Sequence, residues 1–171
     1  MSSIVLTFIG ADRPGLVDAL STVIIEHGGN WEESRMAQLA GKFAGILLVS
    51  VPDNNAAALS NALQTLQTEG LLHITAEQSD ESVVVPSQAL HLELVGQDHP
   101  GIVHDIAHAL ASRNISIEEL NSVTESASMG GGELFRAELQ LRVPDSVNHD
   151  ELRELLENLA NELMVDINLE S

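Results

Sequence analysis

A six-residue phrase occurs twice in this chain of 171 residues, as Gly10-Ala-Asp-Arg-Pro-Gly15 and again as Gly96-Gln-Asp-His-Pro-Gly101. The two copies lie 86 residues apart, and the match continues without a gap as far as Glu32-Glu33 and Glu118-Glu119. A repeat of this length is a small domain rather than a unit of a solenoid. The sequence therefore predicts one small domain in two tandem copies, with any function sought first at the repeated phrase.

The expected elements of the first copy follow from the periodicity of its apolar residues. An apolar run before the phrase indicates a strand, and apolar residues after it recur at the spacing of one helix face. Asp53-Asn54-Asn55, after Pro52, is a start signal for a second helix. The expected order is a strand (4–9), a helix, two strands joined by a turn at Gly41-Lys42 (30–39 and 43–51), a helix and a short strand (71–77).

The order β-α-β-β-α-β is typical of the ferredoxin-like split βαβ fold, in which an antiparallel four-stranded sheet carries both helices on one face. The second copy repeats this order, and Asn148 with Glu151 has the spacing of a capping box before its last helix. The chain is therefore expected to be α+β, with a first domain at 1–78, a linker at 79–88 and a second domain at 89–171. Each copy is near the lower size limit for burying a core, so the copies are expected to pack together.

The copies differ in length at one place. The second is six residues longer around Ser126-Ala-Ser-Met-Gly-Gly-Gly132, which indicates a longer hairpin tip. Such an insertion is either simply tolerated or serves as a lid, and the sequence leaves the role of Gly130–Gly132 open.

Composition excludes several classes of protein. Hydrophobic residues make up 44% of the chain and charged residues 19%, and no apolar run approaches the roughly 20 residues that span a bilayer. The N-terminal residues lack the basic and apolar segments of a secretory signal, so a cytoplasmic location is expected. The absence of cysteine excludes disulfides, thiolate metal sites and a cysteine nucleophile.

The net charge of -19 argues against direct binding to nucleic acid. The chain has 26 acidic residues against seven Lys and Arg, and the seven are scattered. Binding to DNA requires clustered cations that displace counterions from phosphates. Two interpretations of the acidity stay open, a solvated surface that keeps the chain soluble and a surface for a basic protein partner.

The repeated phrase has the residues of a prepared helix N-terminus. The first glycine of the phrase is expected to relax the turn, Asp12 or Asp98 to cap the helix, and Pro14 or Pro100 to lie in its first turn. Unpaired N–H groups and the positive end of the helix dipole accept a carboxylate, and the last glycine of the phrase has no side chain to block it. A carboxylate-bearing metabolite therefore fits, while the alternative is a tight turn with no ligand.

Other candidate sites are weaker. His104 and His108 lie four apart, as in helical metal sites, but both point away from the apolar stripe and are expected to face solvent. Trp31 is expected in the core or between the copies, and Arg35 in a surface salt bridge, although it is also a candidate partner for a carboxylate. Members of the Glu32-Glu33 pair would face opposite ways on a strand, so they form no catalytic dyad. We expect no enzyme, no cofactor and no structural metal.

Several of these residues resemble a known family. Gly-x-Asp-x-Pro-Gly after the first strand, then a helix and Asn30 near the start of the second strand, resembles the ACT domain, a regulatory module that binds amino acids. A chain of two copies with no attached enzyme further resembles the glycine cleavage system transcriptional repressor family. Three phrases are in keeping with that group: Gly28-Gly-Asn-Trp-Glu-Glu-Ser-Arg-Met36, Phe43-Ala-Gly-Ile46 and Gly131-Gly-Glu-Leu-Phe135.

The resemblance implies an amino-acid sensor that regulates transcription of the glycine cleavage system through a DNA-binding activator protein, with glycine as the expected effector. In ACT domains the ligand commonly lies between the first strand–helix turn and the second strand of an adjoining copy. Ser116 stands opposite Asn30 in the gapless alignment and Asn114 lies two residues earlier, so the two sites need not be equivalent. The ligand-binding residues implied are Asp12, Arg13, Pro14, Gly15, Leu16 and Asn30, with Asp98, His99, Pro100, Gly101 and Ile102 in the second copy.

An alternative function stays open beside this one, an acidic protein-interaction module that has no ligand. The sequence does not decide the identity of the ligand, the number of sites, the regulated target or whether the chain forms a homo-oligomer.

Overall fold

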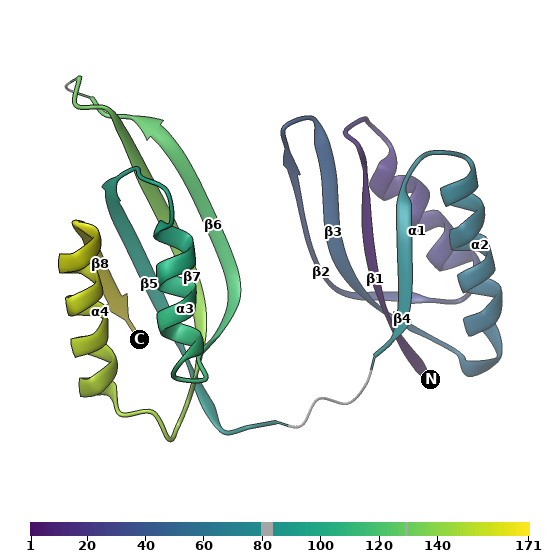
Figure 1. The fold of residues 1–171 in the computed structure, drawn as a ribbon. Coiled ribbons are helices and arrows are strands. Elements are labelled where there is room, and N and C mark those ends of the chain that lie inside the picture. The colour runs from purple at the N-terminus through teal and green to yellow at the C-terminus, as the bar shows by residue number, and fades with distance from the viewer. Residues whose placement is uncertain (80–83, 129) are drawn as a thin grey trace. The chain divides into compact units, whose positions relative to one another are not determined.

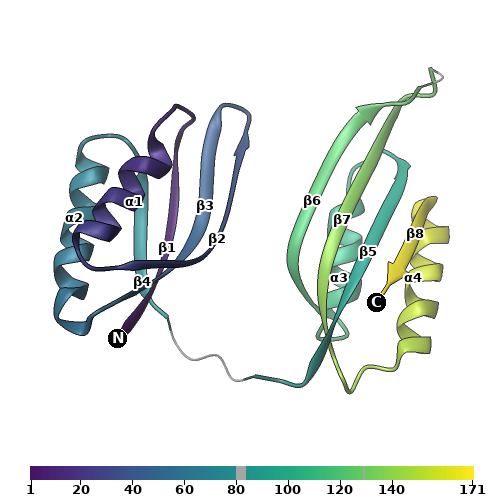
Figure 2. The same cartoon turned by 180° about the vertical axis from the view of Figure 1, so that it is seen from behind.

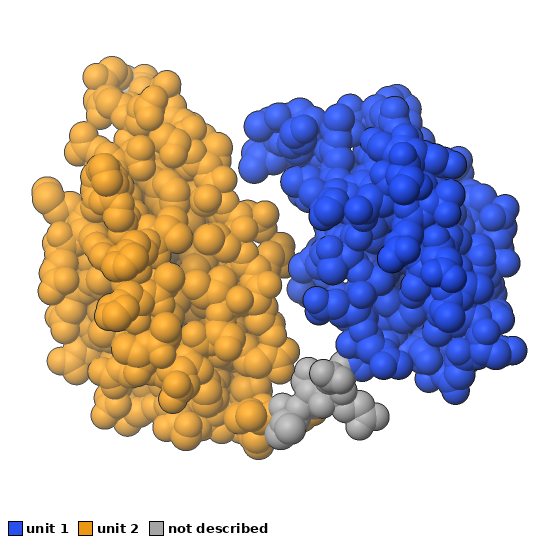
Figure 3. All heavy atoms as spheres, turned by 45° about the vertical axis from the view of Figure 1, so that its right-hand side comes forward, with its two compact units in different colours: residues 1–82 blue, residues 83–171 orange. Residues whose placement is uncertain are grey.

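The computed structural model describes residues 1–79, 84–128 and 130–171. The chain forms two compact units, residues 1–82 and residues 83–171 (Figure 3). Residues 80–83 of the expected linker lie outside the described residues, as does Met129 of the expected glycine-rich hairpin.

Unit 1 has the predicted order of elements. Its sheet has the strand order β2-β3-β1-β4, and each neighbouring pair is antiparallel. Helices α1 and α2 both cover one face of this sheet (Figure 1). The elements are β1 (Ser2–Ala11), α1 (Leu16–Glu26), β2 (Asn30–Leu39), β3 (Lys42–Val51), a short 3-10 helix (Asp53–Asn55), α2 (Ala56–Thr68) and β4 (His73–Gln78).

Unit 2 repeats the same topology with the strand order β6-β7-β5-β8 (Figure 2). The α+β, ferredoxin-like prediction is confirmed for both copies. Strand β5 begins at Ser87, inside the segment expected to be the linker. The elements are β5 (Ser87–Gln97), α3 (Ile102–Ala111), β6 (Ser116–Ser126), β7 (Glu133–Pro144), α4 (His149–Leu163) and β8 (Val165–Glu170).

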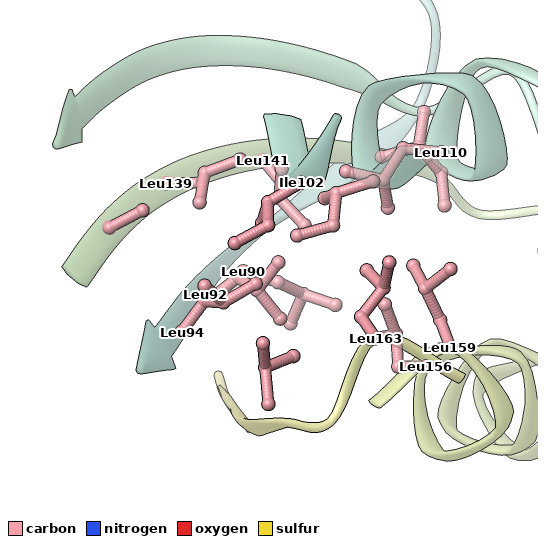
Figure 4. Packing of buried hydrophobic residues seen from close by; sticks show 14 of the residues in the cluster. Leu90, Leu92, Leu94, Ile102, Leu110, Leu139, Leu141, Leu156, Leu159 and Leu163 are labelled. Atoms are coloured by element: carbon pink, nitrogen blue, oxygen red, sulfur yellow. The ribbon is translucent and has the colours of Figure 1, made fainter. Parts of the chain in front are cut away.

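Each unit has its own hydrophobic core between the sheet and its helices. Side chains alternate along β5, which places Leu90, Leu92 and Leu94 in the core, where they are at most 3% exposed. Figure 4 shows these leucines beside Leu139 and Leu141 of β7 and facing the helices. Both helices of a unit lie on one face of its sheet, so the other face has no covering layer of helices within its own unit (Figure 1).

Three local predictions need correction or are confirmed only in part. The hairpin turn between β2 and β3 lies one residue earlier than expected, because Ala40 and Gly41 take the two positive φ values, 50° and 78°, that a type I′ turn requires. The side chain of Asn55 does not cap α2, and its amide donates to the carbonyl oxygen of His27 at 3.0 Å.

Asn148 does cap α4, accepting from the backbone N–H of Asp150 at 2.8 Å and of Glu151 at 3.4 Å. The Glu151 side chain contacts Arg113 at 3.5 Å.

Candidate functional site

The first copy of the repeated phrase forms the turn between β1 and α1. The backbone N–H of Asp12 donates to the carbonyl oxygen of Gly41 at 2.9 Å, which extends the pairing of β1 with the β2–β3 hairpin. Gly15 then reverses the chain with φ 92° and is the residue from which α1 starts. Leu16 is 4% exposed and fastens the helix start to the core. The turn is thus held at both ends, by a strand and by a buried leucine.

The second copy forms the same backbone turn between β5 and α3. Asp98 donates its backbone N–H to Glu133 at 2.9 Å, Gly101 has φ 93°, and Ile102 is buried at the helix start. Because the two glycines share one left-handed conformation, the repeated phrase encodes a backbone shape that only glycine adopts without strain.

The predicted caps at these turns are wrong. Neither Asp12 nor Asp98 makes a side-chain hydrogen bond to its helix, because Gly15 and Gly101 occupy the cap position and the aspartates lie three residues earlier. The prolines precede the cap glycines, so they lie in the turn rather than in the first turn of the helix. The first N–H groups of α1 and α3 are therefore without a side-chain cap, which leaves them to be satisfied by another acceptor.

The glycine that opens each phrase also has a role other than the predicted one. Neither Gly10 nor Gly96 has a positive φ. A Cβ on Gly10 would lie 2.6 Å from the carbonyl oxygen of Leu71, and a Cβ on Gly96 would lie 2.9 Å from Cα of Val165. Gly10 allows close approach of the segment that leads into β4, and Gly96 that of the first residue of β8. The turn itself depends on Gly15 and Gly101.

A hollow of about 180 Å³ lies at the first turn. It combines one guanidinium group with two carboxylates beside the start of a helix. The volume is below the usual range of drug-sized pockets, so it suits only a small molecule. The lining residues are Asp12, Arg13, Gly15, Leu16, Val17, Asp18 and Phe43.

Three of these lining residues, Val17, Asp18 and Phe43, were not predicted from the sequence. Phe43 is the register partner of Gly10 in the β1–β3 ladder, so it lies beside the turn although it is far away in sequence. The predicted elements could have indicated Phe43. Pairing β1 with β3 brings Phe43 beside Gly10 at the start of the phrase.

Asn30 does not join the first turn within unit 1. It pairs with Ser50, which pairs with Ser3, whereas the turn begins after Ala11. The eight residue steps from Ser3 to Ala11 span about 27 Å of strand. The side chain of Asn30 donates to the carboxylate of Glu32 at 2.9 Å.

The region around Asn30 differs between the units. Asn114, the alternative counterpart, has φ 57° and follows α3 where Gly28, with φ 73°, follows α1. Asn114 therefore serves the helix end, since asparagine tolerates the left-handed conformation. Ser116 begins β6 opposite Arg142.

The basic residue of the second turn, His99, has different contacts from Arg13 of the first turn. Nδ1 of His99 lies 3.1 Å from the carbonyl oxygen of Pro100, and Nε2 lies 3.1 Å from that of Leu163 at the end of α4. These two contacts raise the pKa of His99 above its ordinary value, the carboxylates of Asp98 and Asp105 add to the rise, and desolvation opposes it. A neutral imidazole has one N–H, so only the imidazolium donates to both carbonyls.

The glutamate pair of unit 1 lies at an irregularity that the sequence did not predict. A bulge shifts the register between Trp31 and Glu33, so the simple alternation used for this pair does not hold. Hydrogen bonds from Ser50 and Asn30 lower the pKa of the Glu32 carboxyl, while Glu33 contacts Arg35 at 3.6 Å. The predicted surface salt bridge of Arg35 is confirmed.

The remaining predictions concern Trp31 and two histidines. Trp31 packs, partly buried, against the core of unit 1. His104 and His108 are exposed as expected, with their rings stacked at a centroid distance of 6.1 Å. Within residues 1–79, 84–128 and 130–171 no three His, Asp or Glu side chains cluster as metal ligands, and no helix is long and apolar enough to span a membrane.

Comparison with known proteins identifies the fold family. Residues 2–77, which include the first turn, match the family model of the ACT domain, and unit 2 repeats the same fold and phrase. The first unit is an ACT domain, and the second unit has the same topology. The glycine cleavage system transcriptional repressor of Escherichia coli (strain K12) is 25% identical to it over 161 residues, which cover 94% of this chain and 85% of the repressor.

Solved structures agree with the tandem architecture. The crystal structure of an unknown protein from Galdieria sulphuraria has 31% sequence identity and a TM-score of 0.88, over 99% of this chain and 97% of that chain. A second solved structure, with 21% identity and a TM-score of 0.73 over 99% and 96% of the two chains, has the same fold. The chain is thus similar over nearly its whole length to the glycine cleavage system transcriptional repressor, and it has an ACT domain in its first unit.

Proposed function

We propose that this protein senses an amino acid and regulates transcription by binding a DNA-binding protein rather than DNA. The observation that carries the proposal is the match to the repressor across both units, since it covers 94% of the chain. Glycine is the first effector to test, because the name of that relative refers to the glycine cleavage system. The net charge of -19 supports a protein partner, because such a surface repels the phosphates of DNA.

The proposed ligand site is the hollow at the first turn. An amino acid has a carboxylate and an ammonium group, and the hollow provides for both. The uncapped N–H groups at the start of α1 and the guanidinium of Arg13 suit the carboxylate, and Asp12 or Asp18 suits the ammonium. Pro14 restricts the backbone of the turn. Gly15 has no side chain to block the ligand, and buried Leu16 fixes the start of α1 to the core. A role for Asn30 would require β2 of an adjoining copy.

We propose that the second turn does not bind the same ligand in the same way. Its backbone conformation, set by Pro100, Gly101 and Ile102, matches that of the first turn, and Asp98 corresponds to Asp12. Its basic residue differs, because His99 is engaged by two carbonyl oxygens whereas Arg13 lines the hollow.

Thermal unfolding with each of the twenty amino acids tests the site. A ligand that binds only the folded protein at 100 times its Kd stabilises it by about 2.7 kcal/mol. We expect glycine to raise the Tm of the wild type and of H99Q but not of R13Q. Arg13 is exposed, so R13Q is expected to fold normally, and H99Q is the matched change in the other copy.

No shift with any amino acid would contradict sensing by the chain alone. It would favour the second candidate function, an acidic interaction module without a ligand, which the net charge also supports. Such a module would lose its partner as salt rises, and no metabolite would alter the binding. If glycine acts as proposed, ligand binding and partner binding change each other's affinity by the same factor.

A further inference from the structure

The face of the unit 1 sheet opposite its helices carries an apolar strip along β1 and β3. In-register residues on neighbouring strands share one face, so the ladder pairs define rows across the sheet. Leu48 pairs with Val5, Ile46 with Thr7 and Ala44 with Ile9. Ile46 is 56% exposed and Ile9 47%, although both are large aliphatic residues. We call these six residues the β1–β3 strip.

The strip is a property of unit 1 and not of the fold. The corresponding rows of unit 2 pair His91 with Gln140, Glu93 with Glu138, and Val95 with Arg136. Their polar groups bond to one another, with Nε2 of Gln140 2.9 Å from Nδ1 of His91. The same sheet face is thus apolar in one copy and polar in the other. The shared fold therefore does not explain the apolar strip of unit 1.

Acidic residues flank one end of the strip, at the row of Val5 and Leu48. Glu33 pairs with Leu48 on one side, and Glu77 pairs with Val5 on the other, so one row reads Glu33, Leu48, Val5, Glu77. Arg35, in the next row, contacts Glu33 at 3.6 Å. A hollow of about 250 Å³ opens at this end of the strip. Its lining residues are Val5, Glu33, Ser34, Arg35, Ile46, Leu48 and Ser79.

We propose that the β1–β3 strip binds an amphipathic helix of a partner protein, whose apolar face covers the strip and whose basic residues flank it. The two flanking glutamates are three strand spacings apart, about 14 Å, which admits a helix about 10 Å wide. Three rows extend about 14 Å along the strands, which matches about nine residues of helix, or two and a half turns. The helix would complete a third layer on the uncovered face.

Charge decides the occupant. A second copy of this chain has the same excess of acids, 26 against seven basic residues, and would bring glutamates against glutamates. A helix with Lys or Arg on both sides of its apolar stripe, at the end near Val5, pairs with Glu33 and Glu77 instead. The proposal deepens the proposed function by naming the chemistry of the partner, and its test uses neither an amino acid nor a DNA-binding protein.

The probe is a synthetic helical peptide with leucine at positions i, i+3, i+4 and i+7 and lysine at the positions beside them. A scrambled peptide of identical composition has the same charge but no apolar face. Fluorescence anisotropy at physiological salt is expected to show at least tenfold tighter binding of the amphipathic peptide to the wild-type chain. Equal binding of the two peptides would overturn the proposal, because charge alone would explain it.

I46E separates apolar docking from charge, because it adds a carboxylate that attracts lysine while it interrupts the strip. We expect I46E to lose the tenfold preference and V123E to keep it. Val123 is 51% exposed and pairs with Arg136 in unit 2, so V123E adds the same charge on the polar sheet. Equal losses in the two variants would overturn the assignment to unit 1.

Sedimentation of the wild-type chain alone completes the test. Self-association that I46E abolishes would overturn the proposal in favour of a second copy on the strip. Far-UV circular dichroism and the Tm of both variants are expected to match the wild type, since neither residue is buried.

Discussion

Substitution of Gly15 by asparagine, alanine and valine tests whether backbone conformation explains the last glycine of the repeated phrase. Gly15 has φ 92°, and a Cβ built on it would meet no atom within 4 Å. Crowding therefore contributes nothing within the chain, and the cost is that of a positive φ. For an L-residue in the left-handed region this is about 1–2 kcal/mol.

We predict that destabilisation is smallest for G15N, larger for G15A and largest for G15V. Asparagine tolerates positive φ, alanine bears the ordinary strain of about 1–2 kcal/mol, and a β-branched residue is a clear outlier there. A loss of 1 kcal/mol lowers Tm by about 4–8 °C in a domain of this size. If size decided the cost, asparagine and valine would be similar and alanine mildest.

Unfolding in urea, followed by tryptophan fluorescence, reports the free energy of unfolding of unit 1, which contains Gly15. The chain has one tryptophan, and Trp31 packs against the core of unit 1. An order in which alanine is less costly than asparagine would refute the argument from φ. Gly101 has φ 93°, so valine there destabilises unit 2 directly and is no clean test of ligand binding.

Two further predictions concern helix caps and pH. N148A is expected to lower the free energy of unfolding by about 1 kcal/mol, whereas D98A, at a residue that caps no helix, should change it far less. Urea unfolding followed by circular dichroism compares the two variants. Equal losses would contradict the assignment of Asn148 as the cap. Because the pKa of His99 is raised in the folded protein, its stabilisation is fully present below its ordinary pKa and is lost as pH rises through the folded value. The Tm difference between wild type and H99Q should therefore be larger at pH 5.5 than at pH 8.5, and a difference that is constant or grows with pH would contradict this.

Much of the fold was predictable because it depends on local patterns. Alternating apolar residues in strands and one apolar stripe per helix identified the elements, and the duplicated phrase identified the two copies. Boundaries were less accurate where a single conformation decides them, as at Ala40, an alanine with φ 50° that moved the hairpin turn by one residue. The bulge at Glu32 also has no signal in the alternation.

The candidate site was predictable only in part, for the same physical reason. Phe43 and Gly10 meet through the ladder register, and Asn30 is kept about 27 Å along the strand from the turn by that register. His99 finds Leu163 because α4 ends beside the second turn. None of these contacts has a short sequence separation.

The sequence by itself determined the duplication, the order of elements, the acidity and the need for glycine in the phrase, since each depends on neighbouring residues or on composition. Tertiary structure alone decided what each glycine does, because Gly10 and Gly96 are constrained by the approach of residues that are distant in sequence, and Gly15 and Gly101 by their own φ. It also decided that one copy has an apolar sheet face and the other a polar one, because a face exists only after strands that are far apart in sequence have paired.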